Sequence, residues 1–274
     1  MKRLFWIAIT IVGLLFTNNL EAQDSTAHKK KRTTFSGSKD GIHIIDSAKR
    51  VADSVKPKRF TFNLVMMDLG INVLQDLTNY NDPRVLNYLN VPANKQNESL
   101  FNLRQGKSIN VNIYPWMVRF RALETKGQKI FITSGIGLQL YNFRYEQPLT
   151  YTKGAGGVGL DTLSFKKDKV GLDYLNVPLM FTFKTRLYNH KWLVYGAGIT
   201  GGYRIASWTK QVLESGKKVK VHDPFAFADF NSCVTAEIGF ESGLRFYATY
   251  QLTNLYNNGL EQHPFSFGFK LIGL

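Results

Sequence analysis

The sequence predicts an all-β fold: an eight-stranded antiparallel up-and-down transmembrane β-barrel that follows a short N-terminal periplasmic segment. Three observations support this prediction. Hydrophobic residues recur at every second position in eight stretches after residue 59. Short and long connections alternate between these stretches, as in a meander that crosses a membrane. The polar side of the stretches is mainly Gly, Thr, Asn and Gln, which suit a narrow barrel interior better than a surface in water.

The composition excludes several other classes of protein. Of 274 residues, 44% are hydrophobic and 20% are charged, so the chain is neither disordered nor a helical membrane protein. Aromatic residues at 14% and 23 Gly are both abundant, which is typical of strands joined by tight turns. The single cysteine, Cys233, excludes an intramolecular disulfide and a multi-cysteine metal cluster.

Residues 1–22 are predicted to be a cleaved secretory signal peptide. Lys2 and Arg3 precede the apolar residues 4–16, and a cut before Gln23 follows the small residue Ala22. About thirteen apolar residues are too few to cross roughly 30 Å of hydrocarbon as a helix. We therefore expect export of the mature chain.

Residues 23–58 are expected to form a basic periplasmic segment, with nine Lys and Arg against four Asp. A net charge of +15 would ordinarily favour nucleic acid as a partner, because phosphates attract Lys and Arg. Export argues against that partner, so we expect the basic run at residues 29–32 to be solvated or to contact anionic head groups. The apolar spacing over residues 41–55 is typical of a short helix, which Pro57 ends.

Residues 59–274 are predicted to form the barrel. The expected strands are residues 60–73, 108–121, 130–140, 175–186, 192–207, 230–240, 244–252 and 265–271. In the third strand, for example, Ile130 and Ile132 share one face while Thr133 lies on the other. Pro115 interrupts the second strand, so a bulge or a missing ladder bond is expected there. With eight strands, both termini fall on the side of the short turns, which is expected to be the periplasm.

Charged residues on the polar side are expected to be paired, because an unpaired ion in so confined a space is costly. Glu237 is the acidic residue of this set. Its candidate partners are Arg204, Arg245, Lys184 and Arg186. On the apolar side, Tyr195 and Tyr203 stand roughly 20 Å apart in height after strand tilt and are expected to mark two aromatic girdles. Cys233 is expected to fill space in the lumen.

Two glycine patterns imitate a dinucleotide-binding motif. Gly196, Gly198 and Gly201 fit G-x-G-x-x-G, but strand alternation continues beyond them and no second βαβ unit follows. The same pattern at residues 154–159 has no preceding strand and is interpreted as a flexible loop. We expect no cofactor.

No spacing in the sequence selects a catalytic site. His222 and His263 are expected near the outer loops, and Asp223 adjoins His222. Ser215 or Ser266 would be the candidate nucleophiles, but nothing in the pattern joins them into a triad. We therefore expect a protein that is not an enzyme, with no catalytic, cofactor-binding or metal-ligating residues.

Four features, one in the signal peptide and three within residues 60–274, resemble those of a known family. They are the Ala22-Gln23 cut, the Asp-Tyr-Leu-Asn-Val-Pro-Leu opening of a strand at residues 173–179, the Tyr-Gly-Ala-Gly core of residues 192–203, and the last two strands. In these features the chain resembles the outer-membrane β-barrel domain family of Gram-negative bacteria, the porin-like group that includes the PorT-like proteins. The resemblance implies insertion by the barrel-assembly machinery. This chain ends Ile-Gly-Leu, whereas such barrels usually end on an aromatic residue.

Because the interior of an eight-stranded barrel is just filled by side chains, bulk solute flow is not expected. The leading hypothesis is a non-enzymatic cell outer-membrane protein that supports the envelope or binds partners, with a secretion-system accessory role like that of PorT. Narrow porin-type transport of small solutes and a lipid-modifying outer-membrane enzyme stay open as alternatives. Expected partners are outer-membrane lipid, the barrel-assembly machinery and envelope or secretion-system proteins.

Overall fold

The computed structural model describes residues 35–38, 41–44, 59–63, 65–154, 156–188, 191–241 and 244–272. The chain divides into two compact units, Met1–Pro57 and Lys58–Leu274. The predicted signal peptide and the basic run at residues 29–32 lie outside the described residues.

The described part of the first unit is a hairpin. Strands β1 (Phe35–Ser38) and β2 (Gly41–Ile44) are antiparallel, with Phe35 opposite Ile44. The helix predicted over residues 41–55 is therefore wrong for its first four residues, because so short an apolar pattern fits both periods and pairing with β1 satisfies the backbone. The remainder of that prediction, residues 45–55, lies outside the described residues.

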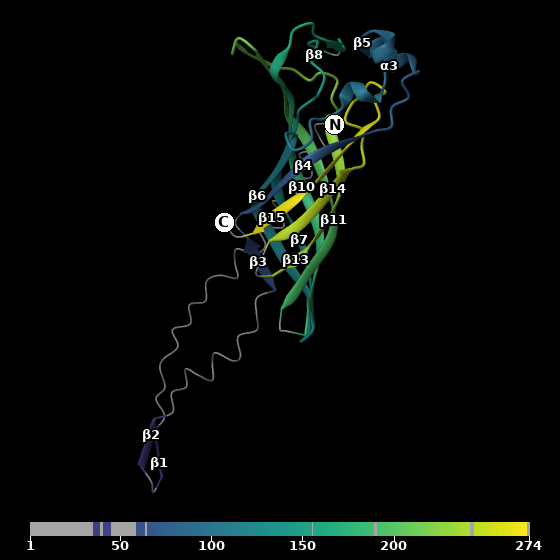
Figure 1. Ribbon diagram of the computed structural model, residues 1–274. Helices are drawn as coiled ribbons and strands as arrows, with labels where there is room; N and C mark the ends of the chain where they lie inside the picture. The colour runs from purple at the N-terminus through teal and green to yellow at the C-terminus, as the bar shows by residue number, and fades with distance from the viewer. Residues whose placement is uncertain are drawn as a thin grey trace, which may run out of the picture. The chain divides into compact units, whose positions relative to one another are not determined.

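Eight strands of the second unit close into an antiparallel up-and-down barrel (Figure 1). Each strand pairs with the next barrel strand along the chain, and the last strand pairs with the first to close the ring. In order, the strands are β4 (Met66–Asp76), β6 (Ile109–Glu124), β7 (Gln128–Phe143), β10 (Phe165–Arg186), β11 (Trp192–Leu213), β13 (Phe230–Phe240), β14 (Arg245–Gln251) and β15 (Gln262–Ile272). All eight predicted strands are confirmed.

Two irregularities lie at the start of the barrel. The first predicted strand is divided into β3 (Phe60–Asn63) and β4, and both pieces pair with β6. Pro115 sits where the register between β6 and β7 shifts, between Ile113 and Trp116. Because proline has no N–H to give to the ladder, the predicted bulge is found at this residue.

Strands β10 and β11 are much longer than predicted, at 22 residues each. Their ladder runs from Phe165 opposite Leu213 to Arg186 opposite Trp192. Strand β12 (Lys218–His222) pairs with residues 208–212 of β11, so the extended ends of β10 and β11 and the short β12 lie side by side as three strands. Residues 165–169 and 209–213, predicted to be loop, are therefore strand, because backbone pairing does not require the apolar outer residues that the prediction used.

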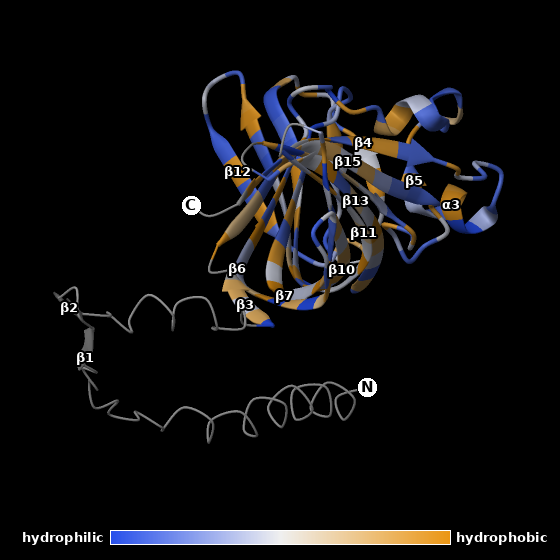
Figure 2. Cartoon of the chain, turned by 90° about the horizontal axis from the view of Figure 1, so that it is seen from below, coloured by the Kyte–Doolittle hydropathy of each residue, from blue (hydrophilic) through white to orange (hydrophobic). Residues whose placement is uncertain are grey.

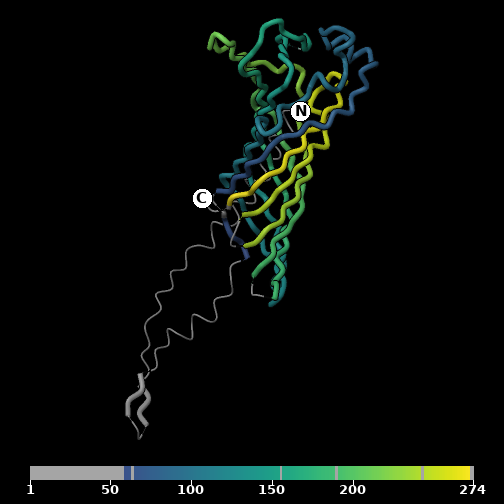
Figure 3. The backbone as a smooth tube through the Cα atoms, viewed as in Figure 1, coloured from purple at the N-terminus to yellow at the C-terminus, as the bar shows by residue number. Residues whose placement is uncertain are grey.

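The long connections also contain regular structure, and it gathers at one end of the barrel (Figures 1 and 3). These elements are α3 (Pro83–Tyr88), β5 (Leu89–Asn90), the 3-10 turns η2 (Ala93–Lys95) and η3 (Glu98–Phe101), β8 (Leu149–Tyr151) and β9 (Val158–Leu160). Asp82 caps α3, because its side chain accepts a hydrogen bond from the backbone of Arg84 at 2.8 Å. Among the described residues, no helix is long and apolar enough to cross a membrane.

The segment at residues 154–159, predicted to be a flexible loop, is strand at its end. Its last two residues begin β9, which pairs with β5 and β8, and Val158 is fully buried. Gly157 has a φ of 114° and leaves no room for a side chain, because a Cβ would collide with the carbonyl oxygen of Tyr88.

Hydrophobic and hydrophilic residues alternate along the barrel strands (Figure 2), and the exposure of their side chains makes the outer face of the barrel apolar and the inner face polar. Exposed outward residues include Leu69, Val177, Phe181, Ile199, Val234, Phe246, Phe267 and Phe269, and buried inward residues include Asp68, Asn112, Thr133, Asn176, Thr182, Thr200 and Glu237. Tyr195 and Tyr203 are on the outer face as predicted. So large an exposed apolar surface is unstable in water and matches lipid hydrocarbon, which is the arrangement of a transmembrane barrel.

Candidate functional site

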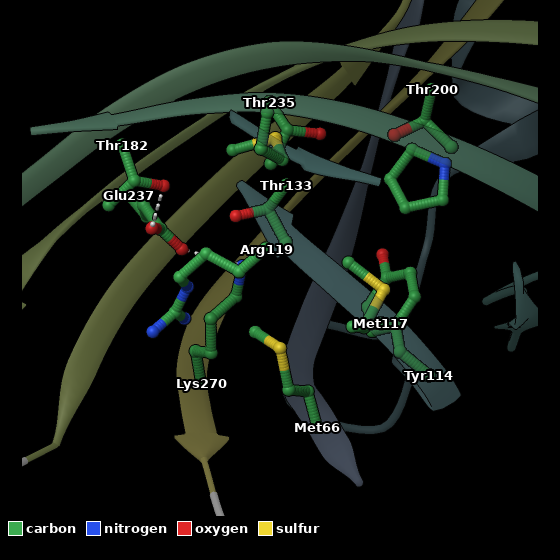
Figure 4. Close-up of a pocket in the computed structure, with 12 residues that line it drawn as sticks. Met66, Tyr114, Met117, Arg119, Thr133, Thr182, Thr200, Thr235, Glu237 and Lys270 are labelled. Carbon is green, nitrogen blue, oxygen red and sulfur yellow. Dashed lines mark hydrogen bonds and ion pairs between the residues drawn. The ribbon is translucent and has the colours of Figure 1, made fainter. Parts of the chain in front are cut away.

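The lumen holds a buried network of ion pairs (Figure 4). Lys270 on β15 donates from Nζ to Glu237 Oε2 on β13 at 2.7 Å. Glu237 Oε1 accepts a hydrogen bond from the Thr182 hydroxyl at 3.2 Å and lies 3.6 Å from Arg245 Nη1. Lys270 Nζ also lies 3.9 Å from Asp68 Oδ1. One carboxylate therefore balances cations from two other strands and ties the barrel together across its interior.

Of the candidate partners of Glu237, Arg245 is confirmed. Arg204 instead pairs with Asp229 at 2.5 Å, and Lys184 pairs with Glu241. Arg186 stands at the end of β10, where its backbone N–H donates to Gly127. Lys270 is the partner that the prediction missed. Alternation places it on the polar side, but only the curvature of the closed barrel brings β15 within reach of β13, two strands away.

Beside this network the lumen contains a cavity of about 20 Å³, which is close to the space of a single water molecule. Its lining includes Met66, Tyr114, Met117, Met180, Thr133 and Thr200. Cys233 is buried with its Sγ 3.9 Å from the Tyr141 hydroxyl, so its predicted role as lumen filler is confirmed.

Above the lumen the long connections fold together around one hydrophobic core. We call these folded connections the cap. The cap core includes Val85, Tyr88, Phe101, Tyr145, Leu149, Tyr151, Val158, Phe225, Phe227, Leu255, Tyr256 and Leu260. Tyr256 is at its centre: its ring centroid is 4.7 Å from that of Phe227, and its hydroxyl is 2.8 Å from that of Tyr151. The Tyr88 hydroxyl donates to the Phe225 carbonyl at 2.8 Å. These buried contacts make the cap a packed structure that covers the barrel end.

One turn of the cap is strained. Phe225 and Ala226 have φ angles of 49° and 63°, a region that residues with a Cβ rarely adopt and that costs on the order of 1 kcal/mol or more each. Asp223 holds the turn, because its Oδ1 accepts from the backbone of Gly154 at 2.7 Å and of Phe225 at 3.2 Å. The surrounding packing therefore maintains a conformation that the isolated turn would not keep.

The structure does not bring the candidate catalytic residues together. His222 is exposed on β12 and His263 lies on β15, and these strands are not neighbours. The His263 ring stacks on Tyr250 with centroids 5.8 Å apart. Ser266 is buried in the lumen and donates to Asn72 Oδ1 at 2.6 Å. Within the described ranges, no three His, Cys, Asp or Glu residues are placed to hold a metal ion.

The first glycine pattern lies inside a strand. Residues 196–201 belong to β11, which continues through them to Leu213. At Gly196 and Gly198, a Cβ would collide with backbone carbonyls of Phe181 and Leu179 on β10. Gly196 and Gly198 therefore allow β10 and β11 to pack closely, whereas a Cβ at Gly201 would meet open space.

A cleft of about 580 Å³ opens beside the cap, between the upper end of β4 and residues 98–105. Its lining includes the carboxylates of Asp76, Glu98 and Glu146, together with Phe101 and Leu103. Asp76 is held in place, because its Oδ2 accepts from the Tyr80 hydroxyl at 2.7 Å and from Gln262 at 2.8 Å. The cleft therefore presents carboxylates in a chain that is otherwise strongly basic.

Asp168 lies on the part of β10 that extends beyond the predicted strand, and its burial should make the stability of the fold depend on pH. It is buried, its Oδ2 has no hydrogen-bond partner among the described residues, and burial raises its pKa to about 7. A raised carboxyl pKa means that the folded state keeps a proton which the unfolded state has lost above about pH 4, so stability falls as the pH rises from about 4 to 7. Asp168→Asn should remove this loss, on the order of 3 kcal/mol at pH 8.

The measurement is the midpoint temperature of heat denaturation in detergent micelles at pH 5 and pH 8. The wild type should be less stable at pH 8, and Asp168→Asn should reduce the difference. Glu214→Gln, at an exposed turn, is the control and should follow the wild type. An Asp168→Asn profile identical to that of the wild type would contradict the assignment.

No model of a known protein family matches this chain, and no curated protein does. Among solved structures, Ail, the attachment invasion locus protein of Yersinia pestis, aligns with 77% of this chain and 98% of its own. The identity is 8% and the TM-score is 0.27. A likeness at that level carries no argument, so the barrel is established by its own strand pairing.

Proposed function

We propose that this chain is a non-enzymatic outer-membrane barrel that binds an envelope partner through its cap. The observation that carries the proposal is the cap itself, in which the long connections pack with residues of β7 and β10 into one buried aromatic core. The apolar exterior and the predicted signal peptide support an outer-membrane location. Which side of that membrane the cap occupies stays a prediction, and the meander pattern favours the outside.

The cap has no role in closing the barrel, since the ring of eight strands is complete without it. Ordering long loops costs conformational entropy, and the strained turn at Phe225 and Ala226 adds to that cost. Ordered loops on a rigid scaffold are commonly where binding residues lie. We therefore assign the function to the surface of the cap.

Within the cap, the cleft lined by Asp76, Glu98 and Glu146 supports a partner with a cationic segment. Its carboxylates would attract Lys or Arg of that partner. The resemblance to PorT-like proteins favours a component of a secretion system as that partner.

The test is purification of the full chain from its own envelope in mild detergent. The wild type should retain a defined envelope or secretion-system protein, and Glu98→Lys with Glu146→Lys should lose it. Glu214→Lys, at the exposed turn between β11 and β12, is the control and should retain it. Retention of the same partner by the double variant would contradict the role of the cleft. Steady single-channel current from the purified wild type in a planar bilayer would favour transport instead.

A further inference from the structure

Lysines stand in register on the outer face of the sheet formed by β10, β11 and β12. Lys169 is opposite Lys210 on β11, and Lys210 is opposite Lys220 on β12. We call these three residues the lysine row. One step farther from the barrel, Lys167 and Lys218 flank the row on the same face, on either side of Val212.

Directly below the lysine row lies Trp208. The Nζ atoms of Lys169 and Lys220 are each 4.6 Å from its ring centroid, so both ammonium groups make cation–π contacts with the indole. Gly171 is opposite Trp208 on β10, and a Cβ at this glycine would collide with the indole. The glycine therefore lets the ring lie flat across β10.

The same face continues downward into the apolar surface of the barrel. Leu175 and Tyr203 are opposite each other, and both are exposed. Lys169 is six residues above Leu175, roughly 20 Å along the strand or about 14 Å in height after a tilt near 45°. Head groups extend several ångströms beyond the hydrocarbon on each side, and lysine side chains reach toward them. Trp208 takes the interfacial position that tryptophan favours.

The lysine row is costly without an anion. Like charges directly opposite each other destabilise a sheet. Burial and the neighbouring charges of Lys167, Lys210 and Lys220 lower the pKa of Lys169 to about 8. On this face the acidic group is Asp173, and the Trp208 side chain hydrogen-bonds to it. One carboxylate does not balance five lysines.

We propose that the lysine row binds the phosphate groups of anionic lipid head groups in the leaflet at the cap end of the barrel. Neighbouring strands lie about 4.8 Å apart, so three ammonium groups in register present a short line of donors to adjacent phosphates. Trp208 sets the depth of the row by resting at the boundary between hydrocarbon and head groups. This site is separate from the acidic cleft, which lies between β4 and residues 98–105.

The test measures which lipids the purified full chain retains. The protein is exchanged into mixed micelles of phosphatidylcholine and phosphatidylglycerol, and the retained lipids are counted by native mass spectrometry. The wild type should enrich phosphatidylglycerol by at least about fivefold, since each lysine near a membrane surface adds attraction. Lys169→Gln, Lys210→Gln and Lys220→Gln together should remove the enrichment, and the three Arg substitutions should keep it.

The charge-matched control is Lys95→Gln, Lys107→Gln and Lys126→Gln, which removes three lysines that lie away from the row. Gel mobility of unheated samples establishes that every variant is folded before lipids are counted. Equal loss of enrichment in the control would overturn the proposal in favour of net charge alone. Undiminished enrichment in the Gln variant would also overturn it. So would displacement of phosphatidylglycerol from the wild type by millimolar inorganic phosphate, which would indicate a site for the free ion.

Discussion

Replacing Glu237 by Gln should destabilise the barrel by about 3–5 kcal/mol, the largest loss expected for a change in the lumen. The substitution keeps the shape of the side chain but leaves Lys270 and Arg245 without the carboxylate that neutralises them. Lys270 Nζ would keep only Asp68, whose Oδ1 lies 3.9 Å away. Because both cations are buried, water cannot replace the missing charge.

The measurement is urea-induced unfolding in lipid vesicles, followed by intrinsic fluorescence. Glu241→Gln is the matched control. Glu241 also pairs with a lysine, Lys184, but its side chain is 46% exposed, so its loss should cost about 1 kcal/mol or less. Equal effects of the two substitutions would show that the ion pairs of the lumen are hydrated and that the central network has no special weight.

Replacing Tyr256 by Ala should open the cap, with a local cost of about 3–5 kcal/mol. The ring packs against Phe227 and the hydroxyl meets Tyr151, so the truncation leaves a cavity and an unpaired polar group at the same place. The barrel strands below keep their complete ladder. We therefore expect the effect to stay within the cap.

Limited trypsin digestion of the folded protein in detergent tests this. Tyr256→Ala should be cleaved rapidly within the cap while the unheated sample keeps the gel mobility of a folded barrel. Tyr188→Ala, whose ring is fully exposed, should resist trypsin as the wild type does. Loss of the folded mobility in Tyr256→Ala would show that cap and barrel unfold as one cooperative unit.

The eight strands could be predicted because the two faces of a membrane barrel meet opposite solvents. Hydrocarbon outside and packed polar groups inside impose a period of two on every strand, as in β10, where Leu175, Val177 and Leu179 are exposed while Asn176 is buried. The bulge at Pro115 could also be predicted, because proline has no N–H to donate and so interrupts the hydrogen bonds between neighbouring strands.

The cap was missed because its core has no period. Tyr88, Tyr151, Phe225 and Tyr256 come from four connections and meet only after the chain has folded. The available signal was composition: so many large aromatic residues in connections are unusual for mobile, solvated loops. The glycines at residues 154–159 instead suggested a flexible loop, although Gly157 is needed because a Cβ there would collide with the carbonyl oxygen of Tyr88.

The amino-acid sequence by itself determined that the chain forms a barrel, how many times it crosses, and which side of each strand meets lipid. Those properties follow from local alternation, which any folded arrangement of these strands must respect. Only the tertiary structure decided that Glu237 pairs with Lys270, that the long connections share one core, and that Lys169, Lys210 and Lys220 stand in register. These contacts join residues far apart in the chain, and their geometry depends on barrel curvature and strand register, which no local pattern encodes.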